Sequence, residues 1–223
     1  MRVLIFGATG MVGQGVLREC LEDPGIESIT IIGRTASGMV LPRVKEIVRA
    51  DLFDYSGFET VFSAVDACFF CLGVTSSGMS EAEYTRLTYT LTLAAAQALS
   101  RIRPGTAFIY VSGSGTDSSE KGRSMWARVK GRTENDLLKL PLNAWMFRPG
   151  FIQPMDGIQS KTPAYRRFYK AIGPLLPLLH KALPNQVLTT REIGQAMIAL
   201  ARDGYSKRIL EARDIRAVLR ERP

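Results

Sequence analysis

The sequence Val3-Leu4-Ile5-Phe6-Gly7-Ala8-Thr9-Gly10-Met11-Val12-Gly13-Gln14-Gly15 stands near the N-terminus. Its four consecutive apolar residues predict a strand that is buried on both faces. Gly7 then allows a sharp turn, Gly10 lets a pyrophosphate approach the main chain, and Gly13 lets the next helix pack close to the strand. Backbone N–H groups at the start of that helix would meet the phosphates. The stretch therefore predicts a dinucleotide site, the alternative being a turn that only joins a strand to a helix.

Strand and helix patterns alternate along most of the chain. Strands are predicted at 3–6, 29–32, 46–50, 67–73, 107–111, 144–147 and 208–210, and helices at 11–22, 55–65, 80–100, 125–140, 189–201 and 214–220. The helix at 189–201 opens with a capping box of Thr189 and Glu192. Because each strand–helix–strand unit implies a right-handed crossover, we predict an α/β fold with a doubly wound parallel sheet.

The 223 residues suffice for one well-buried domain, so we expect a single domain over 1–223. Prolines at 154, 163, 174, 177 and 184 interrupt residues 153–187, which predicts a small C-terminal cap of loops and short helices. Such a cap would lie over the carboxyl ends of the strands and act as a substrate lid. Arg166 and Arg167, with the leucines that follow, offer the alternative of a peripheral membrane contact.

The composition excludes several classes of protein. No stretch approaches eighteen apolar residues and the first residues form a core strand, so we expect neither a membrane span nor a secretory leader. The formal charge of +8 is spread along the chain without a nucleic-acid-binding motif, which favours a solvated surface and a phosphate-bearing cofactor over nucleic acid. The single histidine, His180, has no cysteine or acidic neighbour, so we expect no metal site.

Cysteine usage predicts a reducing compartment. Cys20, Cys68 and Cys71 make an odd number, and two of them lie within an apolar strand pattern. Cys68 and Cys71 are spaced as C-x-x-C, but three residues along a strand place their thiols on opposite faces. We therefore interpret them as core residues rather than as a redox or metal pair, and we expect a cytoplasmic protein.

Arg34 follows the predicted strand at 29–32, where a site that prefers NAD(H) would carry an acidic residue against the ribose 2'-hydroxyl. A guanidinium suits the additional 2'-phosphate of NADP(H), which a carboxylate would repel. The sequence therefore favours NADP(H) over NAD(H). An exposed loop charge with no role in binding is the alternative.

Six motifs occur in a fixed order: Gly7-x-x-Gly10-x-x-Gly13, Asp51-Leu52, Phe70-Cys71-Leu72-Gly73, Val111-Ser112-Gly113-Ser114, Lys130-Gly131 and Arg148-Pro149-Gly150. Together they resemble the atypical, extended-like short-chain dehydrogenase/reductases, in particular the group of the Tat-interacting oxidoreductase, in the branch that includes nucleoside-diphosphate-sugar epimerases. The likeness covers residues 1–150 strongly and the remainder weakly. It implies a Rossmann-type sheet and an oxidoreductase that moves hydride to or from a small carbonyl or alcohol substrate.

The resemblance also implies a set of site residues. The cofactor-binding residues would be Gly7, Thr9, Gly10, Met11, Val12 and Gly13 at the phosphates, Arg34 at the adenosine phosphate, Asp51 and Leu52 at the adenine, and Leu72 and Gly73 along the ribose. In that superfamily a Tyr-x-x-x-Lys pair works with a serine, the lysine holding the nicotinamide ribose and the tyrosine exchanging a proton with the substrate. Lys130 would be the lysine, and Ser112 or Ser114 would polarise the substrate carbonyl.

The tyrosine of that pair is replaced here by Trp126. An indole N–H donates a hydrogen bond but does not titrate near neutral pH, so Trp126 cannot carry the proton. We favour an active enzyme in which Ser114, a water, or another tyrosine such as Tyr84 or Tyr165 replaces the acid. The alternatives are a catalytically silent NADP(H)-binding regulator or scaffold, and a protein whose basic cap contacts a membrane or an acidic partner. The pattern names neither the substrate nor the oligomeric state.

Overall fold

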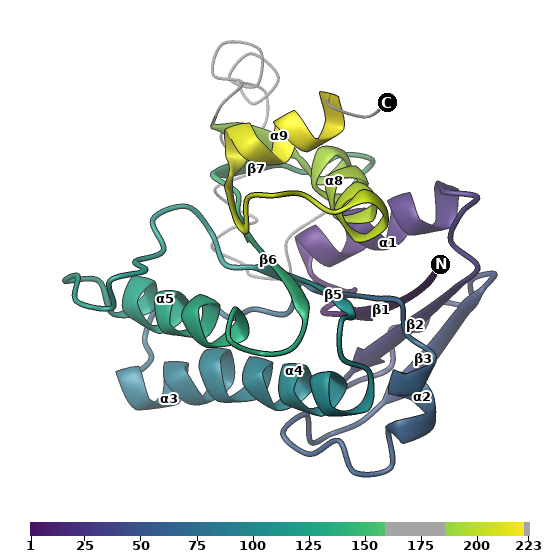
Figure 1. Ribbon diagram of the computed structural model, residues 1–223, viewed down its shortest axis with the longest axis horizontal. Coiled ribbons are helices and arrows are strands. Elements are labelled where there is room, and N and C mark those ends of the chain that lie inside the picture. Colours follow the sequence, from purple (N-terminus) through teal and green to yellow (C-terminus); the bar gives the residue numbers. More distant parts are fainter. Residues whose placement is uncertain (159–185, 221–223) are drawn as a thin grey trace.

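The computed structural model describes residues 1–158 and 186–220, and a seven-stranded parallel sheet lies at its centre (Figure 1). The strand order is β3-β2-β1-β4-β5-β6-β9, so the chain runs outward from β1 to one edge and then from β4 to the other. The strands are β1 (Arg2–Phe6), β2 (Ser28–Gly33), β3 (Val44–Val48), β4 (Ala67–Phe70), β5 (Ala107–Val111), β6 (Asn143–Arg148) and β9 (Ile209–Glu211). The predicted doubly wound parallel sheet is confirmed. The direction in which successive strands are added to the sheet reverses between β1 and β4.

Helices cover both faces of the sheet (Figure 1). One face carries α1 (Met11–Glu22), α8 (Thr190–Asp203) and α9 (Ala212–Arg220). The other carries α2 (Glu59–Ser63), α3 (Glu81–Thr85), the π-helical segment η1 (Arg86–Thr90), α4 (Leu91–Ile102) and α5 (Met125–Leu137). Helix α1 has the predicted bounds, because the glycine turn starts it and Asp23-Pro24-Gly25 ends it.

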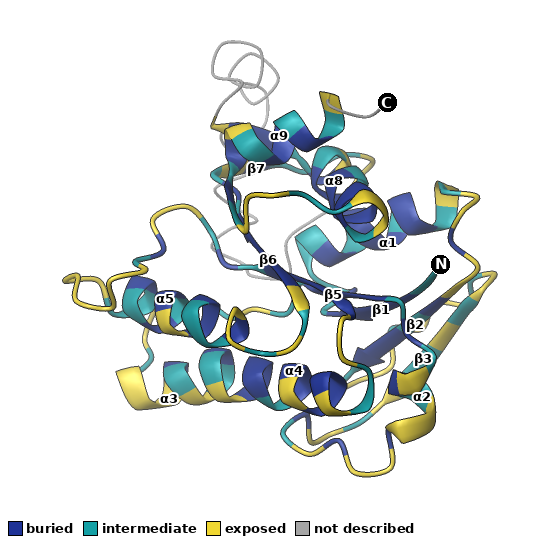
Figure 2. Ribbon diagram, viewed as in Figure 1, coloured by how far each residue is buried: buried dark blue, intermediate teal, exposed yellow. Residues whose placement is uncertain are grey.

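The apolar core is divided by the sheet into two layers, shown by the dark central strands and helix faces of Figure 2. Along β1, Val3 and Ile5 face the layer with α1 and α8, whereas Leu4 and Phe6 face the layer with α2, α4 and α5. Cys68 and Cys71 also belong to opposite layers, as their spacing predicts. Burial raises the pKa of all three thiols, which makes them poor nucleophiles.

Several bounds differ from the prediction: the helix expected at 55–65 is limited to α2, and the strand expected at 46–50 lies at β3. Two further differences concern the kind of element. The helix expected at 80–100 contains η1, where the hydroxyl of Thr92 donates a 2.5 Å hydrogen bond to the carbonyl oxygen of Thr88 and competes with the regular helical pattern. A second, two-stranded parallel sheet of β7 (Phe151–Gln153) and β8 (Val187–Thr189) has no counterpart in the prediction. The predicted capping box at the start of α8 is confirmed, with Thr189 and Glu192 bonded reciprocally.

The predicted cap over 153–187 lies largely outside the described residues. Only 153–158 and 186–187 of the cap are described. Tyr165, Arg166, Arg167 and His180 also lie outside them, so the lid and the membrane contact remain predictions. Within residues 1–158 and 186–220, no helix has the length and apolar character that crossing a bilayer requires.

Candidate functional site

The glycine turn after β1 packs so closely that side chains are excluded from it. Gly7 has φ of 78°, and a Cβ there would stand 2.6 Å from the main-chain nitrogen of Leu72. A Cβ on Gly13 would stand only 2.1 Å from the carbonyl oxygen of Gly7. The carboxyl end of β1 is therefore pressed between the first turn of α1 and the residues that follow β4, as the roles predicted for these glycines require.

The first turn of α1 offers its N–H groups to a ligand. The helix starts at Met11, and Gly10 before it provides no side-chain cap. The first N–H groups of a helix have no acceptor within the helix. A Cβ on Gly10 would meet one atom within 4 Å, the Gly7 carbonyl oxygen at 3.3 Å, so the space in front of the turn is open. Main-chain donors, the positive end of the helix dipole and an open approach fit a diphosphate.

The residues predicted for the adenosine half lie along the same edge of the sheet. Strands β2, β1 and β4 are neighbours, so Arg34, the glycine turn and Leu72-Gly73 follow adjacent carboxyl ends. Arg34 is exposed and makes no hydrogen bond or ion pair with a described residue. Asp51 accepts a 2.8 Å hydrogen bond from the Phe53 N–H, and Leu52 is buried in the core. Leu52 can thus offer a cofactor its main chain only.

A cleft of about 630 Å³ begins directly beyond Gly73. Its wall includes residues 74–76 after β4, residues 112–114 after β5, residues 148–151 after β6, and Glu211 with Ala212 at the far edge. The side chains of Tyr84, Trp126 and Lys130, which bear on the proposed catalysis, also line the cleft. The structure therefore brings both candidate serines, the lysine and the tryptophan into one cleft, next to the end of the predicted cofactor site.

The two candidate serines have different environments. The Ser112 hydroxyl is buried and lies 2.5 Å from Oε1 of Glu134 and 3.0 Å from the carbonyl oxygen of Phe147, so two acceptors compete for its one proton. Ser114 is exposed to the cleft, and its N–H donates a 2.9 Å hydrogen bond to the carbonyl oxygen of Pro149. Its hydroxyl has no hydrogen-bond partner in the described part of the chain. Ser114 is thus placed to meet a ligand, whereas Ser112 is held by its neighbours.

Lys130 lies one helical turn beyond Trp126 on α5, and its Nζ donates a hydrogen bond to the carbonyl oxygen of Ser112. This contact joins α5 to the carboxyl end of β5. Burial lowers the pKa of Lys130 to about 8, and the carboxylate of Glu134 opposes that shift. The ammonium is therefore a stronger acid than an ordinary lysine and exchanges protons nearer to neutral pH.

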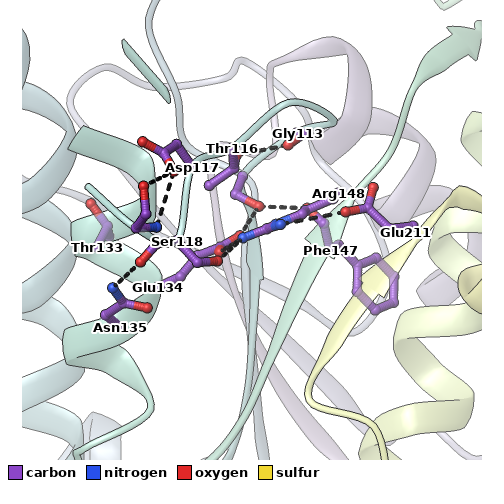
Figure 3. A network of polar contacts seen from close by, with 12 residues as sticks. Gly113, Thr116, Asp117, Ser118, Thr133, Glu134, Asn135, Phe147, Arg148 and Glu211 are labelled. Atoms are coloured by element: carbon purple, nitrogen blue, oxygen red, sulfur yellow. Dashed lines mark hydrogen bonds and ion pairs between the residues drawn. The ribbon is translucent and has the colours of Figure 1, made fainter. Parts of the chain in front are cut away.

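A buried ion pair under the cleft is absent from the sequence-based site. Glu134 on α5 has no exposed surface, and its carboxylate accepts hydrogen bonds from Nε and Nη2 of Arg148 at the end of β6 (Figure 3). Arg148 also reaches Glu211 at 3.4 Å and the Ser118 hydroxyl at 2.6 Å. The bond to Glu134 holds the pKa of Arg148 above its usual value. No spacing in the sequence indicates this pair, because α5 and the end of β6 meet only through the tertiary structure.

Trp126 forms part of the cleft wall beside the loop that carries Ser114. A Cβ on Gly115, which has φ of 86°, would stand 3.4 Å from Cη2 of the indole. The ring is therefore packed against main chain that is free of side-chain atoms. No hydrogen bond to the indole N–H is formed by the described residues.

A family model described as the NAD dependent epimerase/dehydratase family matches residues 3–123. The chain is 27% identical over 231 residues to "Protein FMP52, mitochondrial" of Eremothecium gossypii, covering 99% of this chain and 98% of that protein. Among solved structures, a UDP-glucose 4-epimerase superposes with a TM-score of 0.69 at 16% identity, over 99% of this chain and 82% of that one. The yeast methylglyoxal/isovaleraldehyde reductase Gre2, complexed with NADPH, gives 0.66 at 11% identity, over 95% and 78%. The resemblance seen in the motifs is confirmed, and the chain belongs to the NAD dependent epimerase/dehydratase family.

Proposed function

We propose that this protein is an NADP(H)-dependent oxidoreductase that moves hydride to or from a small carbonyl or alcohol substrate. The observation that carries the proposal is how close the two halves of the site are along the chain. Leu72 packs against Gly7 of the glycine turn, and residues 74–76, which follow Gly73, line the cleft that Ser114 and Lys130 also line. A nicotinamide nucleotide, when bound, supplies or accepts the hydride. The likeness to a reductase complexed with NADPH supports a small aldehyde or ketone as the substrate.

Two parts of the chain would hold the nucleotide. The N–H groups of Met11, Val12 and Gly13 would donate to the diphosphate, because no side chain caps the start of α1. Arg34 would pair with the 2'-phosphate, since it is exposed and unpaired among the described residues. Thr9, Asp51 and Leu52 stay predicted contacts.

The preference for NADP(H) is tested by Arg34→Glu. We expect the variant to bind NADPH at least about tenfold more weakly and NADH within about twofold of the parent, because a charge-assisted hydrogen bond contributes about 1.5 kcal/mol or more. Arg213→Glu is the matched control, since it makes the same charge change on an exposed residue of α9, beyond the other edge of the sheet. Equal losses for NADPH and NADH in Arg34→Glu would refute the 2'-phosphate contact.

Ser114 would polarise the substrate carbonyl through its exposed hydroxyl, and Ser112 would support the loop. Turnover is measured by the absorbance of reduced nicotinamide against aldehydes, ketones and quinones. We expect Ser114→Ala to lower kcat by about a hundredfold to a thousandfold, the loss of one oriented donor, with an unchanged melting temperature. Trp126→Phe keeps an aromatic wall without the N–H, and we expect it to retain most of the activity.

The same assay decides between an enzyme and a regulator. Tight NADPH binding without turnover of any compound on the panel would contradict the proposed activity and favour a catalytically silent nucleotide-binding protein. We also propose a cytoplasmic location, which the unreactive buried thiols support. Recovery of the native protein in a purified mitochondrial fraction would contradict it.

A further inference from the structure

One face of α5 carries Trp126, Lys130 and Glu134 at intervals of four residues. Trp126 and Lys130 line the cleft, and Glu134 lies buried beneath it. Trp126 stands four residues before Lys130, where the resemblance to the short-chain dehydrogenase/reductases implies a tyrosine, but its N–H does not titrate near neutral pH. A reduction at this site therefore needs its proton from a different group.

In residues 1–158 and 186–220, four titratable side chains face the cleft: Tyr84 from α3, Lys130 from α5, Arg148 from β6 and Glu211 from β9. Arg148 is held by Glu134, Glu211 and Ser118, and a guanidinium does not release its proton in proteins. Glu211 serves as an acceptor for Arg148. Tyr84 is 2% exposed, so almost none of its side chain reaches the space where a substrate would bind. Among the described residues that line the cleft, Lys130 alone combines a transferable proton with access to it.

The ammonium of Lys130 is also held in a fixed place. One of its protons is donated to the carbonyl oxygen of Ser112, on the loop that leads to the exposed hydroxyl of Ser114. The other two are available for a ligand. Ser114 and Lys130 line the same cleft, so an oxygen that accepts a hydrogen bond from the Ser114 hydroxyl would lie in a space that Lys130 also lines.

We propose that Lys130 is the proton donor of this enzyme, transferring a proton from its ammonium directly to the substrate oxygen, with Glu134 as its positioning residue. The inference rests on the proposed function. As hydride from the reduced nicotinamide bonds to the carbonyl carbon, the π electrons move to oxygen and the oxygen takes a proton from Nζ. The products are the alcohol, the oxidised nicotinamide and a neutral amine, and Lys130 recovers its proton from water in the cleft.

Glu134 supports this role in two ways. Its carboxylate lies one helical turn from Lys130 and favours the charged form of the lysine. It also accepts from the Ser112 hydroxyl, and so fixes the residue whose carbonyl oxygen binds Nζ. Replacing Glu134 by glutamine keeps the shape of the side chain and removes its charge. The proton affinity of Lys130 should then fall.

The pH dependence gives the first test. The pKa of Lys130 is lowered to about 8, so carbonyl reduction, which needs the ammonium, should lose kcat as pH rises through about 8. Alcohol oxidation needs the neutral amine and should gain kcat over the same range. Glu134→Gln should shift both changes in kcat, the loss in reduction and the gain in oxidation, to lower pH; we call these two changes the limbs of the pH profile. The rate at which Lys130 is acylated by acetic anhydride, followed by mass spectrometry without nucleotide, reports the same titration independently of activity.

Lys130→Arg separates proton transfer from simple binding of the ribose. Arginine keeps the positive charge but does not titrate, so we expect NADPH affinity within about threefold of the parent and a kcat lower by about a hundredfold. Lys139→Arg, the same change on an exposed lysine beyond the end of α5, should behave like the parent. If Lys130→Arg fails to fold, the pH limbs of the parent and of Glu134→Gln decide.

Three results would overturn the inference. The first is a Lys130→Arg variant that keeps the parent's kcat. The second is a pH dependence of kcat that runs in the same direction for carbonyl reduction and alcohol oxidation. The third is loss of turnover in Tyr84→Phe while Lys130→Arg preserves it. A parent protein that turns over no carbonyl compound would overturn the proposed function and this inference together. A parent that turns over a substrate while Lys130→Arg does so equally would overturn the inference alone.

Discussion

Gly13→Ala is the sharpest test of the glycine turn. The added Cβ would stand 2.1 Å from the carbonyl oxygen of Gly7, 2.7 Å from its carbonyl carbon and 2.8 Å from the Cα of Ala8. All three are main-chain atoms, so no side-chain rotation relieves the contact. Since real Cβ atoms do not approach other atoms more closely than 3.0 Å, α1 must move from β1 by about 1 Å.

The magnitude is the difference between two effects. Alanine is favoured over glycine within a helix by about 1 kcal/mol. Overpacking of a tight contact costs about 1–3 kcal/mol and more where the backbone must move. Helix α1 cannot move freely, because a Cβ on Gly15 would already stand 2.6 Å from Cβ of Thr190 on α8. We therefore expect a net loss of about 2 kcal/mol, which lowers the melting temperature by about 4–8 °C for a domain of this size.

The same displacement should weaken nucleotide binding. A shift of about 1 Å carries an N–H···O contact beyond hydrogen-bond distance, and one charge-assisted bond contributes about 1.5–3 kcal/mol. NADPH affinity, measured by calorimetry below the melting temperature, should thus fall by at least about tenfold. Gly73→Ala is the control for stability, because a Cβ there meets no atom within 4 Å. An unchanged melting temperature together with unchanged NADPH affinity in Gly13→Ala would refute the reasoning.

Three further predictions concern stability. Tyr55→Phe should raise the free energy of unfolding by about 1 kcal/mol, because the buried Tyr55 hydroxyl has no hydrogen-bond partner among the described residues; destabilisation in urea would contradict this. Thr189→Ala should lower it by about 1 kcal/mol through loss of the capping box, whereas the exposed Thr60→Ala should not. The hydrogen bond from Arg2 lowers the pKa of Asp66 in the folded protein. The contribution of Asp66 to the free energy of unfolding is therefore fully present above its pKa in the unfolded chain, near 4, and is lost as pH falls through its lower pKa in the folded protein. The free energy of unfolding of Asp66→Asn should therefore fall less steeply with decreasing pH than that of the parent. An acid transition unchanged from that of the parent would exclude the contribution.

Much of the fold follows from local signals in the sequence. The unbroken apolar run of β1 and the stop signal after Glu22 fix the first strand and helix, because each depends on residues that are adjacent in the chain. The pair of β7 and β8 does not follow from such signals. Each strand has three residues, too few to show a period of two. The two strands are also far apart in the sequence, and the segment between them carries no pattern that predicts their pairing.

The candidate site also contains residues that the sequence predicts and residues that it does not. Ser112, Ser114 and Lys130 were expected from motif order, and the structure gathers them in one cleft. The burial of Glu134 was not expected, because a glutamate on an amphipathic helix normally faces solvent. Its partner Arg148 is brought to it only by the pairing of β6 with β5. That contact depends on tertiary structure and leaves no spacing in the sequence.

The buried pair bears on whether the tryptophan marks a lost activity. Burying Glu134 and Arg148 requires removing both charges from water, and well-packed apolar residues in their place are often equally or more stabilising. Stability alone therefore gives little reason for an ion pair under the cleft. Its carboxylate instead fixes Ser112 and favours the charged form of Lys130. Under the proposed function, this arrangement keeps on Lys130 the proton that carbonyl reduction uses, and we take it as a reason to prefer the enzyme. Glu134→Gln that left every pH limb in place would remove this reason for preferring the enzyme.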